Sequence, residues 1–425
     1  MLKKGFWIGV GLFILYAVGI WWYLFYASPQ EIPNAIRGSV ADPNTFMTNQ
    51  EIELSYEYSR LKHFFFFIIT PFEWILYAVI IIFPLSKTFK QWANEITKFK
   101  FFQVMIYVFA FSFTLFVTML PLKWFSYQIS ISYGVSVTPF SVWMRDNITS
   151  FLLNYIMLVA IALWLNWIMN RSPNKWWIYS WFLSIPFTFS VIFIQPVLID
   201  PLYNDFSTLQ NKELESEILS LAQEANIPAE HVYEVKMSAK TNSLNAYVNG
   251  IGPNTRIVLW DTTLAKLNKG SILFIMAHEM AHYVYKHVLL GVSLSILFSF
   301  IGFWIVGKIV KGIKERFEES LHINGNNLLV LPIVLMIFSI LIFISSPISN
   351  YVSREMERAA DSYAIELTED KDAAISAFQQ LTTSGLSEVQ PPTLVYWFRY
   401  RHPSMLERIG KLSYMSEEKS FTNQK

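Results

Sequence analysis

Seven long apolar runs limit what this chain can fold into more than any other feature of its sequence. A helix needs about 20 consecutive apolar residues to cross the hydrocarbon core of a bilayer. Runs of that kind lie at Phe6–Tyr26, Phe64–Leu85, Phe101–Leu120, Ser150–Met169, Trp177–Leu198, Val288–Val310 and Leu328–Ser346. Charged residues make up only 15% of the chain, against about a quarter in soluble domains. The sequence therefore predicts a mainly α-helical bundle of about seven membrane spans.

The composition also excludes several classes of function. The formal net charge is +1, so nothing indicates nucleic acid as a partner. The chain has no cysteine, which excludes disulfides and thiolate metal sites. A metal ion would therefore have to be bound by nitrogen and oxygen ligands, a set that suits Zn²⁺.

The order of apolar and polar segments predicts four parts. Residues 1–199 hold the N-terminal membrane helices, and residues 200–290 form a small α+β unit. Two further spans occupy residues 288–348, and a polar helix and tail occupy residues 349–425. Within the α+β unit the patterns predict a helix at Asn211–Asn226, strands at His231–Met237, Leu244–Asn249 and Thr255–Trp260, and a turn around Gly252 between the last two strands.

The segment His278-Glu279-Met280-Ala281-His282 lies in a run that predicts a helix over Ser271–Leu290. Residues four apart share one face of a helix, so both imidazoles can converge on one metal ion. Glu279 would then lie beside the metal, where a general base for water is needed. The alternative is an ordinary polar helix face. The apolar flanks argue against it, because burying these groups without partners costs several kcal/mol.

A catalytic Zn²⁺ bound by two histidines needs one more protein ligand, since its fourth position stays open for water. The pattern predicts a second helix over Ser353–Leu367, on which Glu357 and Asp361 share one face. We expect Glu357 to bind the metal and Asp361 to accept the free N–H of a ligand histidine, which fixes its tautomer. Glu355 is an alternative ligand. If no metal is bound, the alternative interpretation of this segment is an exposed helix of mixed charge beside the membrane.

The remaining histidines divide between the site and the surface. His402 is a candidate donor to the oxyanion, or a surface residue before a turn. His287 lies five residues beyond His282, off the metal-binding face of a continuous helix, and is left out of the site. Three others have no partner pattern and are expected at the surface or at an interface: His63, His231 and His322.

The strand that carries Asn245 and Ala246 is a candidate for substrate binding. It precedes the motif helix, and a peptide could add to it as an extra antiparallel strand. Such binding uses the peptide backbone and gives little side-chain selectivity. An ordinary short hairpin is the alternative.

Together these motifs resemble a known family. The chain is similar to the integral-membrane zinc metalloproteases of the type I CAAX prenyl protease family, which combine H-E-x-x-H with a distant S-R-x-x-E-x-x-A-D. The corresponding segments here are His278–His282 and Ser353–Asp361. Further similar segments, in order, are Pro201–Phe206, Asn245–Tyr247, Arg256–Thr262 and a tail with His402-Pro403 and Arg408. The resemblance covers nearly the whole chain.

The resemblance implies a bundle of seven membrane helices around a water-filled chamber, with the zinc site at its rim. It implies His278, His282 and Glu357 as ligands of one Zn²⁺ and Glu279 as the catalytic base. A residue at the position of Asp361 is often assigned as proton donor in the family, a role compatible with the one argued above. The family name implies processing of CAAX-box proteins. The compact tail is typical of a bacterial member, and bacteria generally lack protein prenylation, which argues against a prenylated substrate.

Basic residues give an expectation for orientation. If the spans alternate, the basic residues at Lys3 and Lys4 and in the segments 87–100, 171–175 and 308–316 fall on one side. The positive-inside rule then places the N-terminus in the cytoplasm and the α+β unit outside. Eukaryotic relatives carry the catalytic part on the cytosolic side, so the two arguments disagree on the compartment.

The sequence as a whole predicts a zinc endopeptidase of a bacterial cell membrane that cleaves peptides or membrane-associated proteins. A site-two-type intramembrane protease fits less well, because the helix Ser353–Leu367 is too polar for the bilayer core. The non-enzyme alternative is a polytopic transporter or scaffold with a non-catalytic metal site. Transporters tend to show repeat symmetry, and this sequence shows no internal repeat.

Overall fold

The computed structural model describes residues 2–28, 32–249, 255–323 and 327–412. Seven helical segments in this part of the chain are long and apolar enough to cross a membrane. They are Leu2–Ala27, Asn49–Ile82, Lys100–Ser132, Phe140–Arg171, Trp176–Leu202, His287–Phe317 and Asn327–Thr368. Each contains or overlaps one of the predicted spans, so the helical, multi-pass architecture is confirmed.

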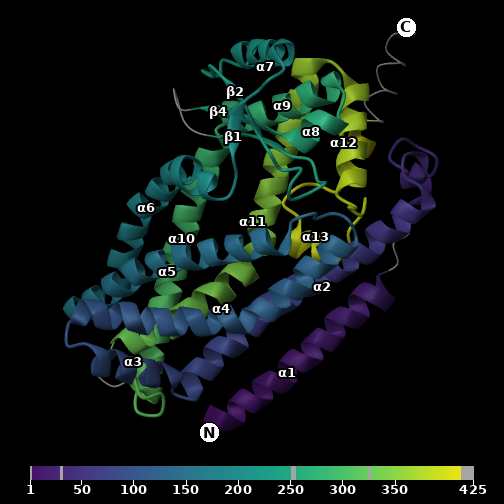
Figure 1. Ribbon diagram of the computed structural model, residues 1–425. Coiled ribbons are helices and arrows are strands. Elements are labelled where there is room, and N and C mark those ends of the chain that lie inside the picture. The colour runs from purple at the N-terminus through teal and green to yellow at the C-terminus, as the bar shows by residue number, and fades with distance from the viewer. Residues whose placement is uncertain (1, 29–31, 250–254, 324–326, 413–425) are drawn as a thin grey trace.

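The first half of the chain is a bundle of long helices (Figure 1). Its elements are α1 (Leu2–Trp22), α2 (Asn49–Ile82), α3 (Leu85–Ile96), α4 (Lys100–Ser132), α5 (Phe140–Arg171) and α6 (Trp176–Ile194). The N-terminus and α3 lie at one end of the molecule, and the small sheet lies at the other (Figure 1). Aromatic and aliphatic side chains such as Tyr107, Phe111 and Ile80 fill the core between these helices.

Helix α2 begins well before its apolar part because Thr48 and Glu51 form a capping box. The Thr48 hydroxyl accepts the Glu51 N–H, and the Glu51 carboxylate accepts the Thr48 N–H at 2.7 Å. This satisfies backbone donors that a helix start leaves free. The polar first turns of α2 therefore extend the helix beyond the predicted span.

A four-stranded sheet follows the first five spans. Its strands are β1 (Phe206–Thr208), β2 (Val232–Val235), β3 (Ala246–Asn249) and β4 (Arg256–Trp260), in the order β1-β2-β4-β3. Strand β2 is parallel to β4, and β3 is antiparallel to β4. The three predicted strands are confirmed with shorter ends, whereas β1 was not predicted. The predicted turn around Gly252 lies outside the described residues.

Helices cover the sheet and complete the chain. They are α7 (Lys212–Glu224), α8 (Asp261–Lys266), α9 (Lys269–Val284), α10 (His287–Phe317), α11 (Leu331–Thr368), α12 (Lys371–Ser384) and α13 (Thr393–Arg399). The predicted helix at Asn211–Asn226 is confirmed as α7. Its buried Ile218 packs in one apolar cluster with Ile257 of β4 and Met276 of α9. The α+β unit therefore has its own hydrophobic core, and α9 packs along one side of it.

Two predicted helix boundaries are wrong. The motif helix does not run to Leu290, because α9 ends at Val284 and Lys286 takes the left-handed conformation with φ of 55° before α10 begins. The segment Ser353–Leu367 is not a separate helix but the C-terminal part of α11, which continues from the seventh span. Pro347 lies within α11, and membrane helices tolerate proline when neighbouring groups satisfy the freed backbone.

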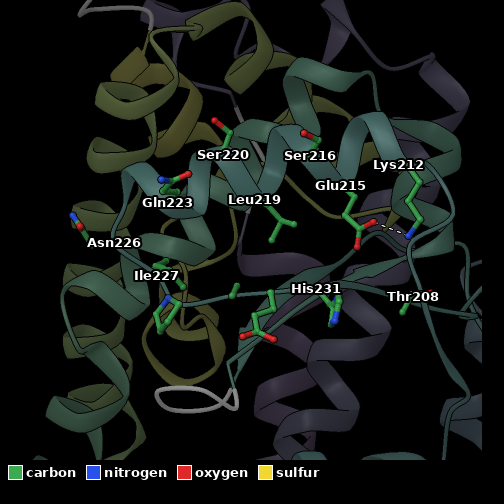
Figure 2. Close-up of a pocket in the computed structure, with 13 residues that line it drawn as sticks. Thr208, Lys212, Glu215, Ser216, Leu219, Ser220, Gln223, Asn226, Ile227 and His231 are labelled. Atoms are coloured by element: carbon green, nitrogen blue, oxygen red, sulfur yellow. Dashed lines mark hydrogen bonds and ion pairs between the residues drawn. The ribbon is translucent and has the colours of Figure 1, made fainter.

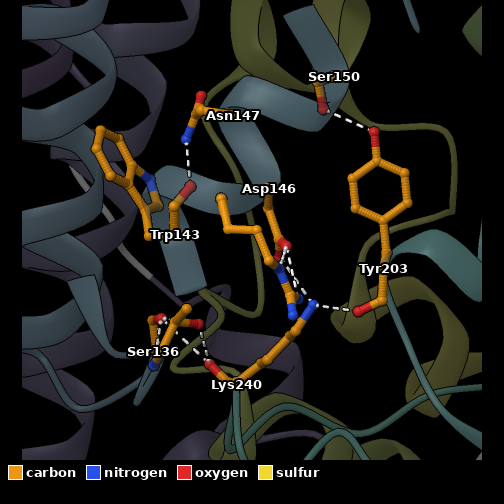
Figure 3. Close-up of polar contacts among 9 residues, drawn as sticks. Ser136, Trp143, Asp146, Asn147, Ser150, Tyr203 and Lys240 are labelled. Carbon is orange, nitrogen blue, oxygen red and sulfur yellow. Dashed lines mark hydrogen bonds and ion pairs between the residues drawn. The ribbon is translucent and has the colours of Figure 1, made fainter. Parts of the chain in front are cut away.

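Lys240 joins the α+β unit to the membrane helices (Figure 3). Its ammonium group donates to Asp146 Oδ2 of α5 and to the carbonyl of Tyr203, both at 2.8 Å. Its carbonyl accepts from the Thr138 hydroxyl at 2.8 Å and from the Val137 N–H at 3.0 Å, in the link between α4 and α5. The loop that enters β3 is thereby held on the membrane bundle.

We expect Lys240→Met to loosen this junction while preserving the length of the side chain. A hydrogen bond to a charged group contributes about 1.5–3 kcal/mol, so exchange of the amide hydrogens in 134–138 and 240–243 should accelerate by roughly tenfold or more. Hydrogen–deuterium exchange with mass spectrometry measures this directly. Arg145→Met is the matched control, since the Arg145 side chain is 56% exposed and pairs with the same Asp146. Equal exchange in both variants would contradict the role of Lys240.

Candidate metal centre and active site

The candidate metal site lies where α9 packs along α11. Small side chains line this seam and are fully buried, among them Ala277 and Ala281 of α9 and Ala360 and Ala364 of α11. Small residues allow two helix backbones to approach closely. The close approach brings the two-histidine face of α9 against the carboxylates of α11.

Three side chains converge at this seam, as the sequence predicts. The Nε2 atoms of His278 and His282 are 3.3 Å apart. Oε2 of Glu357 lies 3.1 Å from His278 Nε2, and Oε1 lies 3.4 Å from His282 Nε2. These three residues form a group that could hold a metal ion, with one ligand atom from each within 4.8 Å of the others. Two imidazoles and one carboxylate are a donor set that suits catalytic Zn²⁺ and leaves a position for water.

The Asp361 carboxylate lies behind His278. Its Oδ1 is 2.9 Å from His278 Nδ1, within ion-pair distance, although the N–H is not aligned for a regular hydrogen bond. Arg408 from the tail binds both oxygens of Asp361, with Nη2 at 2.6 Å from Oδ1 and Nε at 2.9 Å from Oδ2. The guanidinium is buried and also covers the ring of Phe378, 4.1 Å from its centroid. Such bidentate contacts stabilise the ionised carboxylate.

Burial and neighbouring charges shift the pKa values of three side chains on α9. Burial alone would lower the pKa of His278, but its contacts with Asp361 and Glu357 outweigh burial and raise it to about 10. Burial, together with the charge of His278, lowers the pKa of His282 to about 4. Burial raises the pKa of Glu279, although the charge of His278 opposes this shift. In this environment Glu279 is a stronger base than an exposed carboxylate.

The structure places the other predicted site residues around this group. His402 Nδ1 lies 2.8 Å from Glu357 Oε2, so His402 reaches the site through the expected ligand. Asn245 is exposed just before β3, and Ala246 is buried as its first residue. Glu355 is exposed and pairs with Arg358 instead of joining the two histidines.

Sequence reasoning missed two histidine environments. The sequence predicts His63 at the surface or at an interface, but it is 1% exposed and interacts with Glu388 and Arg399. Its partners lie more than 300 residues away, and no local pattern signals them. The five-residue spacing predicts His287 outside the site, yet its Nδ1 lies 2.9 Å from His282 Nδ1. No local signal in the sequence marks this contact, because it depends on the break between α9 and α10, and the residues at that break look helical.

The α+β unit also carries a separate cavity, of about 970 Å³, between α7 and the segment that leads into β2 (Figure 2). Its lining includes Lys212, Glu215 and His231, and Lys212 is ion-paired with Glu215 at 2.7 Å. None of the residues of the metal group lines this cavity. The cavity is therefore distinct from the site formed by α9 and α11.

The fold and the site define a class of protein, namely a membrane-embedded metallopeptidase with a His-His-Glu metal site. Residues 208–416 match the model of peptidase family M48, and residues 23–205 match that of the CAAX prenyl protease N-terminal domain with five membrane helices. The chain belongs to peptidase family M48 and is a multi-pass integral membrane metalloprotease similar to CAAX prenyl protease 1.

Individual relatives agree with this assignment. An uncharacterized metalloprotease, YhfN, of Bacillus subtilis is 47% identical over 93% of both chains. CAAX prenyl protease 1 of Saccharomyces cerevisiae is 27% identical over 71% of this chain and 70% of its own length. The crystal structure of Ste24p from S. mikatae superposes with a TM-score of 0.79 over 95% of this chain and 97% of that chain, at 22% identity. That structure shows the same fold.

We expect Arg408→Met to destabilise the protein strongly, because it leaves the Asp361 carboxylate buried without its cation. Breaking a buried ion pair on one side costs about 3–5 kcal/mol. Thermal unfolding in detergent should show this as a large loss of the unfolding temperature. Arg358→Met is the control, since its pairs with Glu355 and Glu407 are solvent-exposed and contribute about 0–1 kcal/mol. A double variant with Asp361→Asn should recover part of the loss. Equal effects of the two single variants would contradict the prediction.

Proposed function

We propose that this protein is a zinc-dependent endopeptidase that hydrolyses peptide bonds of peptides or of membrane-associated proteins. The observation that carries this proposal is the convergence of His278, His282 and Glu357, with Glu279 beside His278 in the same helix. Two imidazoles and one carboxylate fit Zn²⁺ and leave room for a water molecule. A bound Zn²⁺ would supply Lewis acidity and lower the pKa of its water toward about 7.

Glu279 is the residue that moves the proton in this mechanism. Its carboxylate accepts the proton of the attacking water and passes it to the leaving amine. Burial raises the pKa of Glu279, which brings it closer to the range in which a carboxylate can both accept and release a proton near neutral pH.

Asp361 acts on the orientation of His278. Its position at His278 Nδ1 favours the tautomer that presents Nε2 to the metal. A proton-donor role would require a protonated carboxyl group. The two contacts with Arg408 favour the ionised form instead, so orientation is the better supported role.

Strand β3 is the proposed binding site for the substrate backbone. It lies at one edge of the described sheet and packs against α9. An extended peptide could add to this edge as a further strand, which places its backbone along the site. The Thr263 hydroxyl accepts the Asn245 N–H at 2.9 Å and donates to the Asn245 carbonyl at 2.7 Å, which holds the start of the strand in place. A hairpin without a substrate role is the competing interpretation.

Two roles are proposed for His402, and they differ in whether its Nε2 must carry a proton. If its Nδ1–H donates to Glu357, its Nε2 carries a proton only in the imidazolium form. Stabilising an oxyanion would require that form, whereas orienting Glu357 would not. We therefore propose His402 first as a residue that orients Glu357, and second as an oxyanion donor.

The Glu279→Gln variant separates the peptidase from a transporter or scaffold with a non-catalytic metal. The amide keeps the shape of the side chain but cannot accept the proton, so we expect cleavage of an unmodified quenched peptide library to fall by at least about 100-fold. Bound zinc, quantified in both proteins, should stay at one ion per chain. A wild type that binds zinc but cleaves no peptide or membrane-protein substrate would support the non-enzyme alternative.

We propose a bacterial cell membrane as the location, with the α+β unit outside. The relative from Bacillus subtilis supports the first part. The clustering of the N-terminus and the basic helix α3 at the end opposite the sheet supports the second, through the positive-inside rule (Figure 1). The names of the eukaryotic relatives point to CAAX proteins as their substrates. For this chain we propose that a prenyl group is not required.

The absence of cysteine makes this orientation directly testable. Ser207→Cys places one thiol on exposed β1, and Lys311→Cys places one near the opposite end of α10. A membrane-impermeant maleimide applied to intact cells should label the first variant and spare the second. Permeabilised cells, in which both should react, are the control. The reverse pattern would place the catalytic unit in the cytoplasm.

A further inference from the structure

His287 contacts the expected ligand His282 on the side of the ring away from the other two ligands. The Nδ1 atoms of the two imidazoles are 2.9 Å apart, and their rings meet edge to face with centroids 5.0 Å apart. His287 is 9% exposed and is the first residue of α10. The Nε2 atom of His282, at the opposite end of its ring, is the one that faces His278 and Glu357.

The break between α9 and α10 makes this contact possible. On a continuous helix a residue five positions further on is rotated by about 140° and faces away. Here Lys286 has φ of 55° and ψ of 36°, which ends α9 and starts a new helix axis. A left-handed conformation costs a residue with a Cβ about 1 kcal/mol or more. This cost falls on Lys286, the residue whose conformation turns His287 back onto His282.

The position of the proton shared by the two imidazoles determines whether His282 can bind a metal through Nε2. A nitrogen–nitrogen contact at this distance is a hydrogen bond only if one nitrogen carries a proton and the other accepts it with its lone pair. If the proton is on His282 Nδ1, His287 Nδ1 accepts it, and His282 Nε2 has a free lone pair for a metal. If the proton is on His287 Nδ1, His282 must hold its own proton on Nε2, and that nitrogen cannot bind a metal.

We propose that His287 is a positioning residue for His282, which accepts its Nδ1–H and so fixes the ring and the tautomer that present Nε2 to the metal. The inference rests on the proposed zinc site and assigns to His282 the kind of partner that Asp361 provides for His278. His287 thereby links the metal site to the first turn of membrane helix α10.

Two substitutions test the acceptor function. His287→Leu removes the acceptor and replaces the imidazole with an apolar side chain of similar bulk. His287→Asn places the oxygen Oδ1 near the position of imidazole Nδ1 and restores an acceptor. Zinc affinity of the detergent-purified proteins is measured by competition with a chromogenic zinc chelator. Loss of such a partner typically weakens metal binding 10–100-fold, so we expect that loss for His287→Leu and recovery to within about threefold for His287→Asn.

The controls separate positioning from folding. His231→Leu removes an exposed histidine elsewhere and should leave zinc affinity unchanged. Thermal unfolding of the zinc-free proteins should give nearly the same midpoint for wild type and His287→Asn, which keeps the acceptor, and a modestly lower one for His287→Leu, which leaves the His282 N–H unpaired. A purely structural role would lower that midpoint in both variants alike.

Different outcomes contradict the positioning role of His287 and the proposed function. Unchanged zinc affinity in His287→Leu, or equal losses in the Leu and Asn variants, would overturn the positioning role. A wild type that binds no zinc, or binds it but cleaves nothing, would instead overturn the proposed function. The affinity measurement does not depend on activity, so the two failures are distinguishable.

Discussion

The packing of α9 against α11 is the interaction on which the rest of this structure depends. It brings two imidazoles and two carboxylates into an apolar seam, where each would be costly alone. Mutual contacts among His278, Glu357 and Asp361 offset that cost, and Arg408 supplies the cation that Asp361 needs. The alanines of the seam are therefore as necessary to the chemistry as the polar groups, because larger side chains would separate the helices.

Buried polar groups fasten the C-terminal tail to this seam. The Arg354 guanidinium donates to the carbonyls of Tyr396 and Tyr400 and stacks on the Tyr396 ring, 4.2 Å from its centroid. Arg399 at the end of α13 and Glu388 before α13 both bind His63 of α2. Each of these groups is expensive to bury and is compensated by a specific partner. The tail is thereby fixed where its later residues, His402 and Arg408, reach the metal group.

The sequence predicts those parts of the molecule that local periodicity governs. Apolar runs predict the seven spans, and the four-residue spacing predicts which faces of α9 and α11 carry the polar groups. It does not predict Lys286, because lysine has no preference for the left-handed conformation and its neighbours look helical. The partners of His63 were also out of reach, since contacts across more than 300 residues leave no local pattern. The resemblance marks Arg408 only as part of a similar tail segment, so both its place at the site and its bidentate contact with Asp361 required the fold.

The two halves of the metal group are attached to the membrane in different ways. Glu357 and Asp361 belong to α11, which runs without a break from its apolar span into the site. His278 and His282 belong to α9, which is separated from α10 by the turn at Lys286. A continuous helix transmits a displacement along its axis, whereas a turn can absorb it. The contact between His282 and His287 crosses that turn. It links α9 to α10 by side chains, whereas α11 links its span to the site through an unbroken helix. The pair of imidazoles therefore adds a direct contact between α10 and a metal ligand to the packing of α10 against α9 and α11.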